Sequence, residues 1–339
     1  MFSNLAWREN EQLKAQTSHG VAMAVYKDQL CMVYVGQGGA NLWMAQMSSL
    51  AEPLSLTSNS QIRISNHNPQ TAWRPAIASD GNLLHCVYSG QSDTFVYWSW
   101  FDGANWAGNI KLPPLPHGPE LHQVQTSLMM FNGILHCVAV LPFTTGGPTN
   151  YQMLMSTYTP GSPLASSSWS PFTQISSTRT LAAPSLSIIG SQLILAATNP
   201  ANGIGIAPLG AQPISTHDWA PLKLGLLASI GAVTAAWGDD GGVLVIFSNL
   251  SGSLFYAYVN VSEFVTASSG WPFTAIPIQG DIQIVCPNST PATSAPPGVA
   301  VFHGCFVVAY KGVDSDNFFI TYAPAPLSIN PGTVFKPNL

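Results

Sequence analysis

The chain has 339 residues, of which 46% are hydrophobic and only 7% are charged, and its formal net charge is −5. The large apolar share excludes a disordered chain, and ten Lys plus Arg without a basic block argue against nucleic-acid partners and polybasic membrane contacts. No apolar run approaches the roughly 20 residues of a membrane span, so membrane insertion is not expected.

The N-terminal stretch MFSNLAWRENEQLKAQ has neither the basic nor the apolar region of a secretory signal. The five cysteines form no C-x-x-C pair, so we expect buried free thiols and neither a metal nor a cofactor. Free thiols without a signal predict synthesis in the cytoplasm, with any release by a leaderless route.

An apolar strand recurs along the chain. Its copies begin at Gln29, Asn82, Gly133, Gln192, Gly242 and Gly304. Aligned on their first apolar residues, the copies lie 54, 51, 58, 51 and 62 residues apart. Those aligned residues are Leu30, Leu84, Leu135, Leu193, Leu244 and Phe306. This period is typical of propeller blades with long loops.

Each copy is preceded by a short strand of small apolar residues and a tight turn such as Asp80-Gly81 or Asn132-Gly133. A third strand follows, most aromatic in FVYWSWF from Phe95. The expected fourth strands are shorter, namely QIRIS, NIKLP, FTQIS, PLKLG, AIPIQ and GTVF. Trp7–Gln16 carries the one helical pattern in the chain.

Four antiparallel strands repeated six times predict an all-β fold, a six-bladed β-propeller of four-stranded antiparallel blades. Each blade buries two apolar faces against its neighbours, and a ring leaves no end blade exposed. Residues 1–339 then form a single domain, with blades at roughly 17–66, 67–116, 117–178, 179–226, 227–280 and 281–339. We expect Thr333–Phe335 or Phe2–Trp7 to complete the last blade.

The segment Ser99–Trp106, SWFDGANW, combines an Asp-Gly turn with a tryptophan. It resembles the D-G-x-x-W turns of propeller lectins and, more loosely, the Asp-box of sialidase-like propellers. The wider repeat resembles six-bladed propeller lectins and sialidase-like propellers, and the likeness is closest in the second blade. The resemblance implies a propeller that binds carbohydrate.

Tryptophan recurs at the Trp106 position, as Trp169, Trp219 and Trp271. Such a residue either packs between blades or presents a ring face to a sugar, whose C–H faces are apolar. His85 and His136 occupy equivalent positions and are either packed between blades or bonded to sugar hydroxyls. The expected stacking residues are Trp43, Trp73, Trp98, Trp100 and Trp106, and the expected hydroxyl-binding residues are Arg74, His85, Asp102 and Asn105.

The first functional hypothesis is a lectin whose shallow sites, between or atop blades, recognise glycans multivalently without catalysis. A non-catalytic protein-interaction or toxin-associated propeller is the second. A sialidase-like glycoside hydrolase is the third, because Arg74 precedes a first strand where sialidases place an arginine. The chain has four arginines, and its few glutamates lie in expected loops or ends, so an enzyme is not expected.

Overall fold

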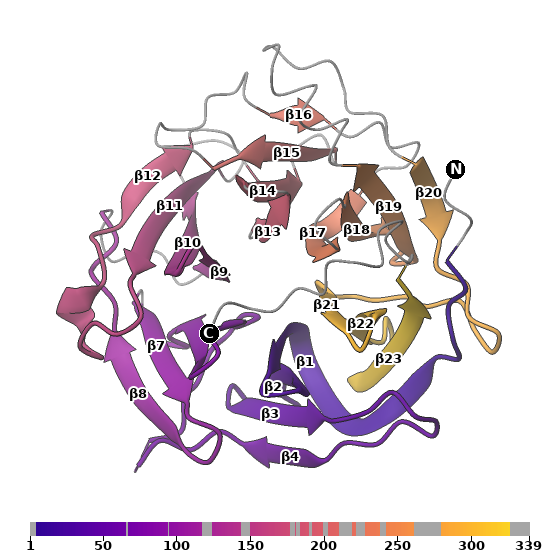
Figure 1. Ribbon diagram of the computed structural model, residues 1–339, viewed down its shortest axis with the longest axis horizontal. Helices are drawn as coiled ribbons and strands as arrows, with labels where there is room; N and C mark the ends of the chain where they lie inside the picture. Colours follow the sequence, from indigo (N-terminus) through magenta and orange to yellow (C-terminus); the bar gives the residue numbers. More distant parts are fainter. Residues whose placement is uncertain are drawn as a thin grey trace, which may run out of the picture.

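The computed structural model describes residues 5–65, 67–93, 95–116, 124–143, 150–176, 180, 184–189, 192–198, 203–209, 219–221, 228–237, 242–260 and 279–325. Antiparallel sheets stand around a common centre (Figure 1). The described residues contain one short 3-10 helix, η1 (Ser166–Ser168), and otherwise only strands, turns and loops. The all-β prediction is therefore confirmed.

Four of the sheets contain four strands each, with the first strand in sequence innermost (Figure 1). Their strands are β5 (Ala76–Ser79), β6 (Leu84–Ser89), β7 (Val96–Phe101) and β8 (Trp106–Lys111); β9 (Gln125–Phe131), β10 (Ile134–Phe143), β11 (Asn150–Tyr158) and β12 (Thr173–Ser176); β13 (Ser185–Ile189), β14 (Gln192–Thr198), β15 (Ile204–Pro208) and β16 (Ala220–Pro221); β17 (Ala228–Trp237), β18 (Gly242–Asn249), β19 (Leu254–Asn260) and β20 (Gln279–Gln283).

The remaining sheet has seven strands and joins the two ends of the chain. In spatial order they are β21 (Gly298–Phe302), β22 (Cys305–Lys311), β23 (Asn317–Pro324), β1 (Glu11–Tyr26), β2 (Gln29–Gly36), β3 (Leu42–Met47) and β4 (Ser58–Gln61). The beginning of β1 pairs with β23, whereas its end pairs with β2, and the register shifts between Thr17 and Val21. We call β21–β23 with Glu11–Gln16 the last half-sheet, and Val21–Tyr26 with β2–β4 the first half-sheet.

This arrangement corrects two expectations about the termini. Glu11–Gln16 forms the outer strand of the last half-sheet, and residues 5–7, the described part of the expected Phe2–Trp7 stretch, are not part of it. The segment Trp7–Gln16 is therefore not a helix. Trp7 instead packs beside Tyr256, and Arg8 N–H donates to Tyr322 O at 2.8 Å. Thr333–Phe335 lies outside the described residues.

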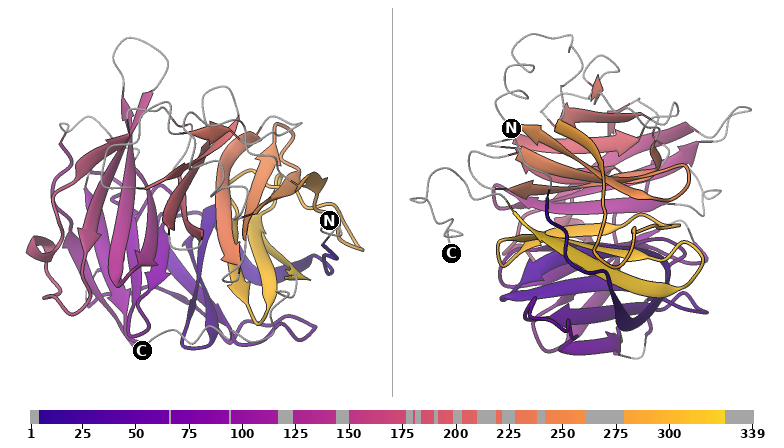
Figure 2. Two further views of the ribbon diagram at one scale, coloured as in Figure 1. Left: turned by 45° about the horizontal axis from the view of Figure 1, so that its top comes forward. Right: turned by 90° about the vertical axis from the view of Figure 1, so that its right-hand side faces the viewer.

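The inner strands contact one another in succession. β1 contacts β5, β5 contacts β9, β9 contacts β13, β13 contacts β17, β17 contacts β21, and β21 contacts β1. Figure 2 shows the same sheets from two further directions. The predicted first, second and third strands of each repeat are all present, while β4, β8 and β20 begin some residues away from the predicted fourth strands.

The hairpins between inner and second strands follow from their turn residues. Lys27 and Asp28 have φ of 47° and 58°, and Asn132 and Gly133 have φ of 49° and 73°. Two successive positive φ angles give a turn whose twist matches the twist of the flanking strands. These turns set the register in which each inner strand pairs with its neighbour.

Apolar side chains between adjacent sheets form the core, and they expose one register error in the repeat alignment. Leu84 and Leu135 pack toward the preceding sheet, as Leu30, Leu193 and Phe306 do. Leu244 instead packs with Phe306 of the following sheet. A shift of one residue along a strand turns every side chain to the opposite face. In β18, the true equivalent of Leu30, Leu84 and the other aligned residues is therefore a residue next to Leu244 in the sequence.

A buried threonine fastens several sheets to the preceding one. Thr17, Thr71 and Thr293 each stand four or five residues before the start of an inner strand segment, at Val21, Ala76 and Gly298 respectively. Their backbone N–H groups donate to Asp316 O, Ala40 O and Gly252 O respectively. Each hydroxyl also donates to the carbonyl two residues later, which satisfies the buried side chain.

Candidate functional site

A pocket of about 490 Å³ lies where the last half-sheet meets the first half-sheet, and we call it the seam pocket. One wall is the Gln12–Gln16 segment of β1, and the other comes from β2, β3, β4 and the turn after β2. The residues of the second wall are Tyr34, Gly36, Gln37, Trp43 and Asn59. Side chains of the last half-sheet and of the first half-sheet therefore line one cavity.

Trp43 supplies the aromatic surface of the seam pocket. It lies on β3 opposite Tyr34 of β2 and is half-buried. Its indole packs over Gly36, where a Cβ atom would overlap the ring. Glycine at this position thus lets the indole lie flat against the backbone of β2.

A hydrogen-bond chain connects the two walls. The Tyr34 hydroxyl donates to Asn59 Oδ1 at 2.6 Å, and Asn59 Nδ2 donates to Lys14 O at 3.1 Å. Burial raises the pKa of Tyr34 to about 12, partly offset by the bond to Asn59, so the phenol remains a donor at neutral pH. The exposed side chains around this chain are Gln12, Lys14, Gln16, Gln37 and Asn59.

The Tyr34, Gly36 and Trp43 arrangement recurs with fixed spacing. Tyr88, Gly90 and Tyr97 repeat it in the β5–β8 sheet, and Tyr310, Gly312 and Phe319 repeat it in the last half-sheet. In each copy the aromatic residue follows the tyrosine by nine positions and pairs with it across two strands. This Tyr-x-Gly signal in the sequence also marks Tyr34 and Gly36, which were not among the predicted site residues, whereas Trp43 was.

His85 and Trp98, two expected ligand residues, are fully buried. Trp98 Nε1 donates to His85 Nδ1 at 3.2 Å, and His85 Nε2 lies 3.1 Å from Asp80 Oδ2. Trp98 also packs against Tyr158 at a ring-centroid distance of 4.8 Å. Both side chains therefore belong to the core between two sheets, which corrects the expectation that they face a ligand.

The Asp80 carboxylate anchors this buried network. Burial by itself raises the pKa of Asp80, but hydrogen bonds from His85 and from the backbone N–H groups of Leu83 and Asn82 outweigh it. The pKa of Asp80 is consequently lowered from its ordinary value. With Nδ1 accepting from Trp98, Nε2 of the neutral ring donates to the Asp80 carboxylate.

Asp102 and Asn105 lie in an exposed turn. Asp102 Oδ1 accepts hydrogen bonds from the backbone N–H groups of Ala104 and Asn105, each at 2.7 Å. These bonds lower the pKa of Asp102. Lys27 Nζ donates to Asp102 O at 2.8 Å and links this turn to the first half-sheet. One oxygen of the carboxylate is thus committed to holding the turn.

The other tryptophans of the second repeat are half-buried. Trp100 lies over Gly108 and 4.8 Å from Trp98, and Trp106 packs beside Phe101 at 5.4 Å between ring centroids. Of the residues equivalent to Trp106, Trp169 is buried and Trp219 packs against an intersheet core. Trp271 lies outside the described residues.

Trp73 and Arg74 lie where the chain enters β5. The Trp73 ring meets the His19 ring edge-on at 6.4 Å. Arg74 Nη1 donates to Pro297 O at 2.9 Å, and Arg74 lines a second cavity, of about 390 Å³, that we call the central channel. Of the nine expected ligand residues, the structure thus brings only Trp43 to the seam pocket and only Arg74 to the channel.

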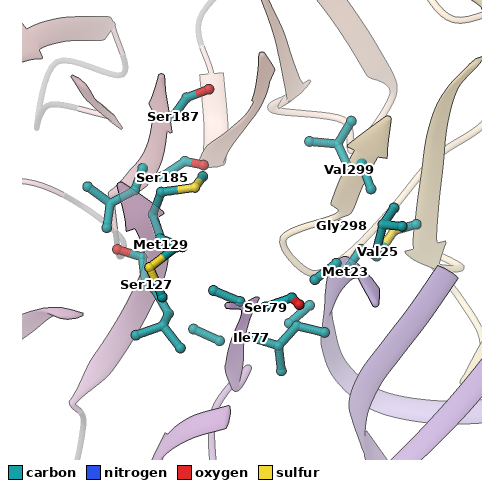
Figure 3. A pocket seen from close by; sticks show the side chains of 18 of the residues that line it. Met23, Val25, Ile77, Ser79, Ser127, Met129, Ser185, Ser187, Gly298 and Val299 are labelled. Atoms are coloured by element: carbon teal, nitrogen blue, oxygen red, sulfur yellow. The ribbon is translucent and has the colours of Figure 1, made fainter. Parts of the chain in front are cut away.

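The central channel is enclosed by inner strands (Figure 3). Its described lining comes from β1, β5, β9, β13 and β21. Met23, Ile77 and Met129 represent its apolar side chains in the close-up view, and Ser79 and Ser185 its hydroxyls (Figure 3).

No protein-family model and no curated protein matches the sequence. Solved structures resemble the fold at low sequence identity. A fucose-specific lectin from Aleuria aurantia aligns with a TM-score of 0.56 at 11% identity, covering 93% of this chain and 99% of the lectin. An alpha-L-arabinofuranosidase of Fusarium graminearum aligns with a TM-score of 0.62 at 10% identity, covering 94% of this chain and 98% of the arabinofuranosidase.

A sialidase of Trypanosoma rangeli aligns with a TM-score of 0.60 at 10% identity, covering 96% of this chain and 59% of the sialidase chain. These likenesses show an all-β, propeller-like fold, similar to propeller lectins and sialidase-like propellers, which confirms the resemblance seen in the sequence. Among the described residues there is no helix long and apolar enough to cross a membrane.

Proposed function

We propose that the protein is a non-catalytic carbohydrate-binding propeller that holds a neutral sugar in the seam pocket. The observation that carries this proposal is the position of Trp43, whose indole lines an open pocket among exposed amide side chains. Lectins are among the proteins that share the fold, which supports the proposal without assigning a sugar.

The chemistry of the pocket suits a sugar ring. The C–H face of a pyranose is apolar and packs well on an indole, whereas its hydroxyls need both donors and acceptors. Gln12, Gln16, Gln37 and Asn59 carry amides that offer both. Lys14 adds the one cation of the described lining, and a single exposed cation among four amides favours a neutral glycan over a highly charged one.

The same lining favours binding over hydrolysis. Glycoside hydrolysis by the usual routes uses two carboxyl groups on either side of the scissile bond. The described residues that line the seam pocket include no Asp or Glu. Arabinofuranosidases and sialidases share the fold, so fold alone does not decide between these activities.

We further propose that the propeller has six blades. The register shift in β1 divides the seven-stranded sheet into two four-stranded units, which join the four separate sheets. The succession of contacts among six inner strands supports the same count. In this scheme β1 closes the ring, and the seam pocket lies between the last blade and the first.

Glycan-array screening followed by calorimetry with the best glycan tests the function. We expect Trp43→Ala to weaken binding by about five- to thirtyfold, because stacking on an indole contributes about 1–2 kcal/mol. Trp43→Phe should retain part of the affinity. Tyr97→Phe, at the equivalent position of the next sheet, is the matched control and should bind normally.

Two results would contradict the proposal. One is an array on which no glycan binds, which would favour a protein-interaction propeller. The other is a bound glycan whose affinity is the same for Trp43→Ala, which would place its site elsewhere. Sustained turnover in a fluorogenic glycoside panel would contradict the non-catalytic part of the proposal.

A further inference from the structure

The central channel differs from the seam pocket in the chemistry of its wall. Its described lining is dominated by Val, Ala, Met, Ile and Leu, and Arg74 is the one charged residue in it. The hydroxyl oxygens of Ser127 and Ser187 are themselves buried, so they offer little to a ligand. A polyhydroxylated ligand would therefore lose hydrogen bonds to water there without replacing them.

Apolar surface is also left open in the channel. Val25 is 38% exposed, an unusual value for a valine on an inner strand. The five lining residues Val21–Val25 of one strand extend over about 13 Å, at about 3.3 Å per residue. The channel thus offers length and apolar contact to a ligand with a hydrocarbon chain.

Arg74 marks one end of this channel. It precedes β5, while the turn that follows β5 lies at the other end of the strand. Its guanidinium donates to Pro297 O, and it forms no ion pair with any described residue. Burial lowers the pKa of Arg74 to about 10, so the group remains cationic at neutral pH. A partly buried cation without an anionic partner is costly, and an anionic ligand would offset that cost.

The backbone around Arg74 fixes its side chain. A Cβ atom at Gly20 would lie 2.9 Å from Arg74 Cδ and would overlap Pro296 O. The Arg74 side chain is therefore packed directly against the β1 backbone, where only glycine leaves room. Such packing holds the cation at the end of the channel before any ligand arrives, which lowers the entropic cost of binding.

We propose that the central channel binds an aliphatic carboxylate, with the carboxylate on Arg74 and the hydrocarbon chain along Met23, Ile77 and Met129. Both parts of this ligand match an observed feature, because guanidinium groups pair with carboxylates and the remaining wall is apolar. The site shares no described residue with the seam pocket, so it does not depend on carbohydrate binding.

Calorimetry with decanoate, below its micelle-forming concentration, tests the inference. We expect saturable one-to-one binding, weakened about tenfold or more in Arg74→Ala because a charge-assisted bond is lost. Decanol, which has the same chain but no carboxylate, should bind more weakly than decanoate. Arg63→Ala, which removes an exposed arginine outside the channel, should bind decanoate normally.

A second variant keeps the test decisive if Arg74→Ala does not fold. Val299→Trp narrows the channel but leaves Arg74 in place, and it should abolish decanoate binding. Absence of decanoate binding by the folded parent protein would overturn the inference. Binding of decanoate by Val299→Trp as tight as by the parent protein would also overturn it. So would gluconate binding as tightly as decanoate, because the apolar wall would then contribute nothing to affinity.

Discussion

The first half-sheet and the β5–β8 sheet carry the same aromatic position in two different states. In the first half-sheet Trp43 lines the open seam pocket. In the β5–β8 sheet the equivalent Tyr97 donates to Asp93 Oδ2 at 2.6 Å, and Lys111 Nζ lies 5.8 Å from the centre of its ring. One repeat leaves the aromatic surface open to a pocket, while the other covers it with its own side chains.

The difference arises from what stands beside the aromatic residue. Beside Trp43 the facing wall is the Gln12–Gln16 segment of β1, which pairs with β23 of the last half-sheet and meets the first half-sheet at the seam. Beside Tyr97 a local turn supplies Asp93, four residues away. The two repeats therefore share the same backbone arrangement around the aromatic residue. The neighbouring side chains determine whether its ring is open or covered.

The largest expected effect separates the open aromatic position from the core. Trp98→Ala should lower the free energy of unfolding by about 3–5 kcal/mol, because a fully buried indole leaves a cavity. Trp43 is half-buried, so the matched Trp43→Ala variant should lose clearly less free energy of unfolding. Denaturant unfolding of both variants measures the difference. Equal losses would mean that Trp43 is a core residue, and the contrast between the two regions would fail.

The strands that could be predicted from the sequence were those marked by nearby residues. Alternation of apolar residues and the Asp80-Gly81 and Asn132-Gly133 turns located the inner and second strands. Closure was not predictable in this way, because Glu11–Gln16 pairs with residues about 300 positions later. That pairing depends on the completed ring. The only sequence signal of the strand is a short alternation of apolar and polar residues, which also fits a helix.

The candidate site was predictable in part for a related reason. Alternation shows which residues share a face of a strand, but here both faces of a sheet are buried against neighbours. Trp98 and His85 were thus indistinguishable from Trp43 by pattern, although the structure buries them fully. Tyr34 and Asn59 were missed because their bond joins β2 to β4, and the Tyr-x-Gly spacing was the one local clue.

A smaller effect is expected where Tyr97 is covered. Tyr97→Phe removes the bond to Asp93 and should lower the free energy of unfolding by about 1–2 kcal/mol. Because Asp93 Oδ1 also accepts from Phe95 N–H, a double-mutant cycle with Asp93→Ala isolates the side-chain pair. A coupling energy near zero would show that the pair does not hold Tyr97, and the distinction between open and covered positions would then need another cause.

The last expected effect concerns the hydrogen-bonded phenol of the seam pocket at high pH. Burial raises the pKa of Tyr34 to about 12, whereas an unfolded tyrosine ionises near 10. Between about pH 10 and 12 the unfolded chain therefore loses this proton while the folded protein keeps it, so the folded state binds more protons and stability falls as pH rises. Tyr88 and Tyr97 also have raised pKa values and act in the same direction, so the parent protein alone is not diagnostic.

The diagnostic quantity is the difference between the parent protein and Tyr34→Phe. The phenylalanine variant lacks the titrating group, so its unfolding free energy should fall less steeply over this pH range. Denaturant titrations at several pH values measure both slopes. Parallel slopes would show that Tyr34 ionises as readily in the folded protein as in the unfolded chain. The Tyr34 hydroxyl would then be exposed to solvent and would not hold Asn59 in place. The hydrogen-bond chain from Tyr34 through Asn59 to Lys14 O would not be rigid.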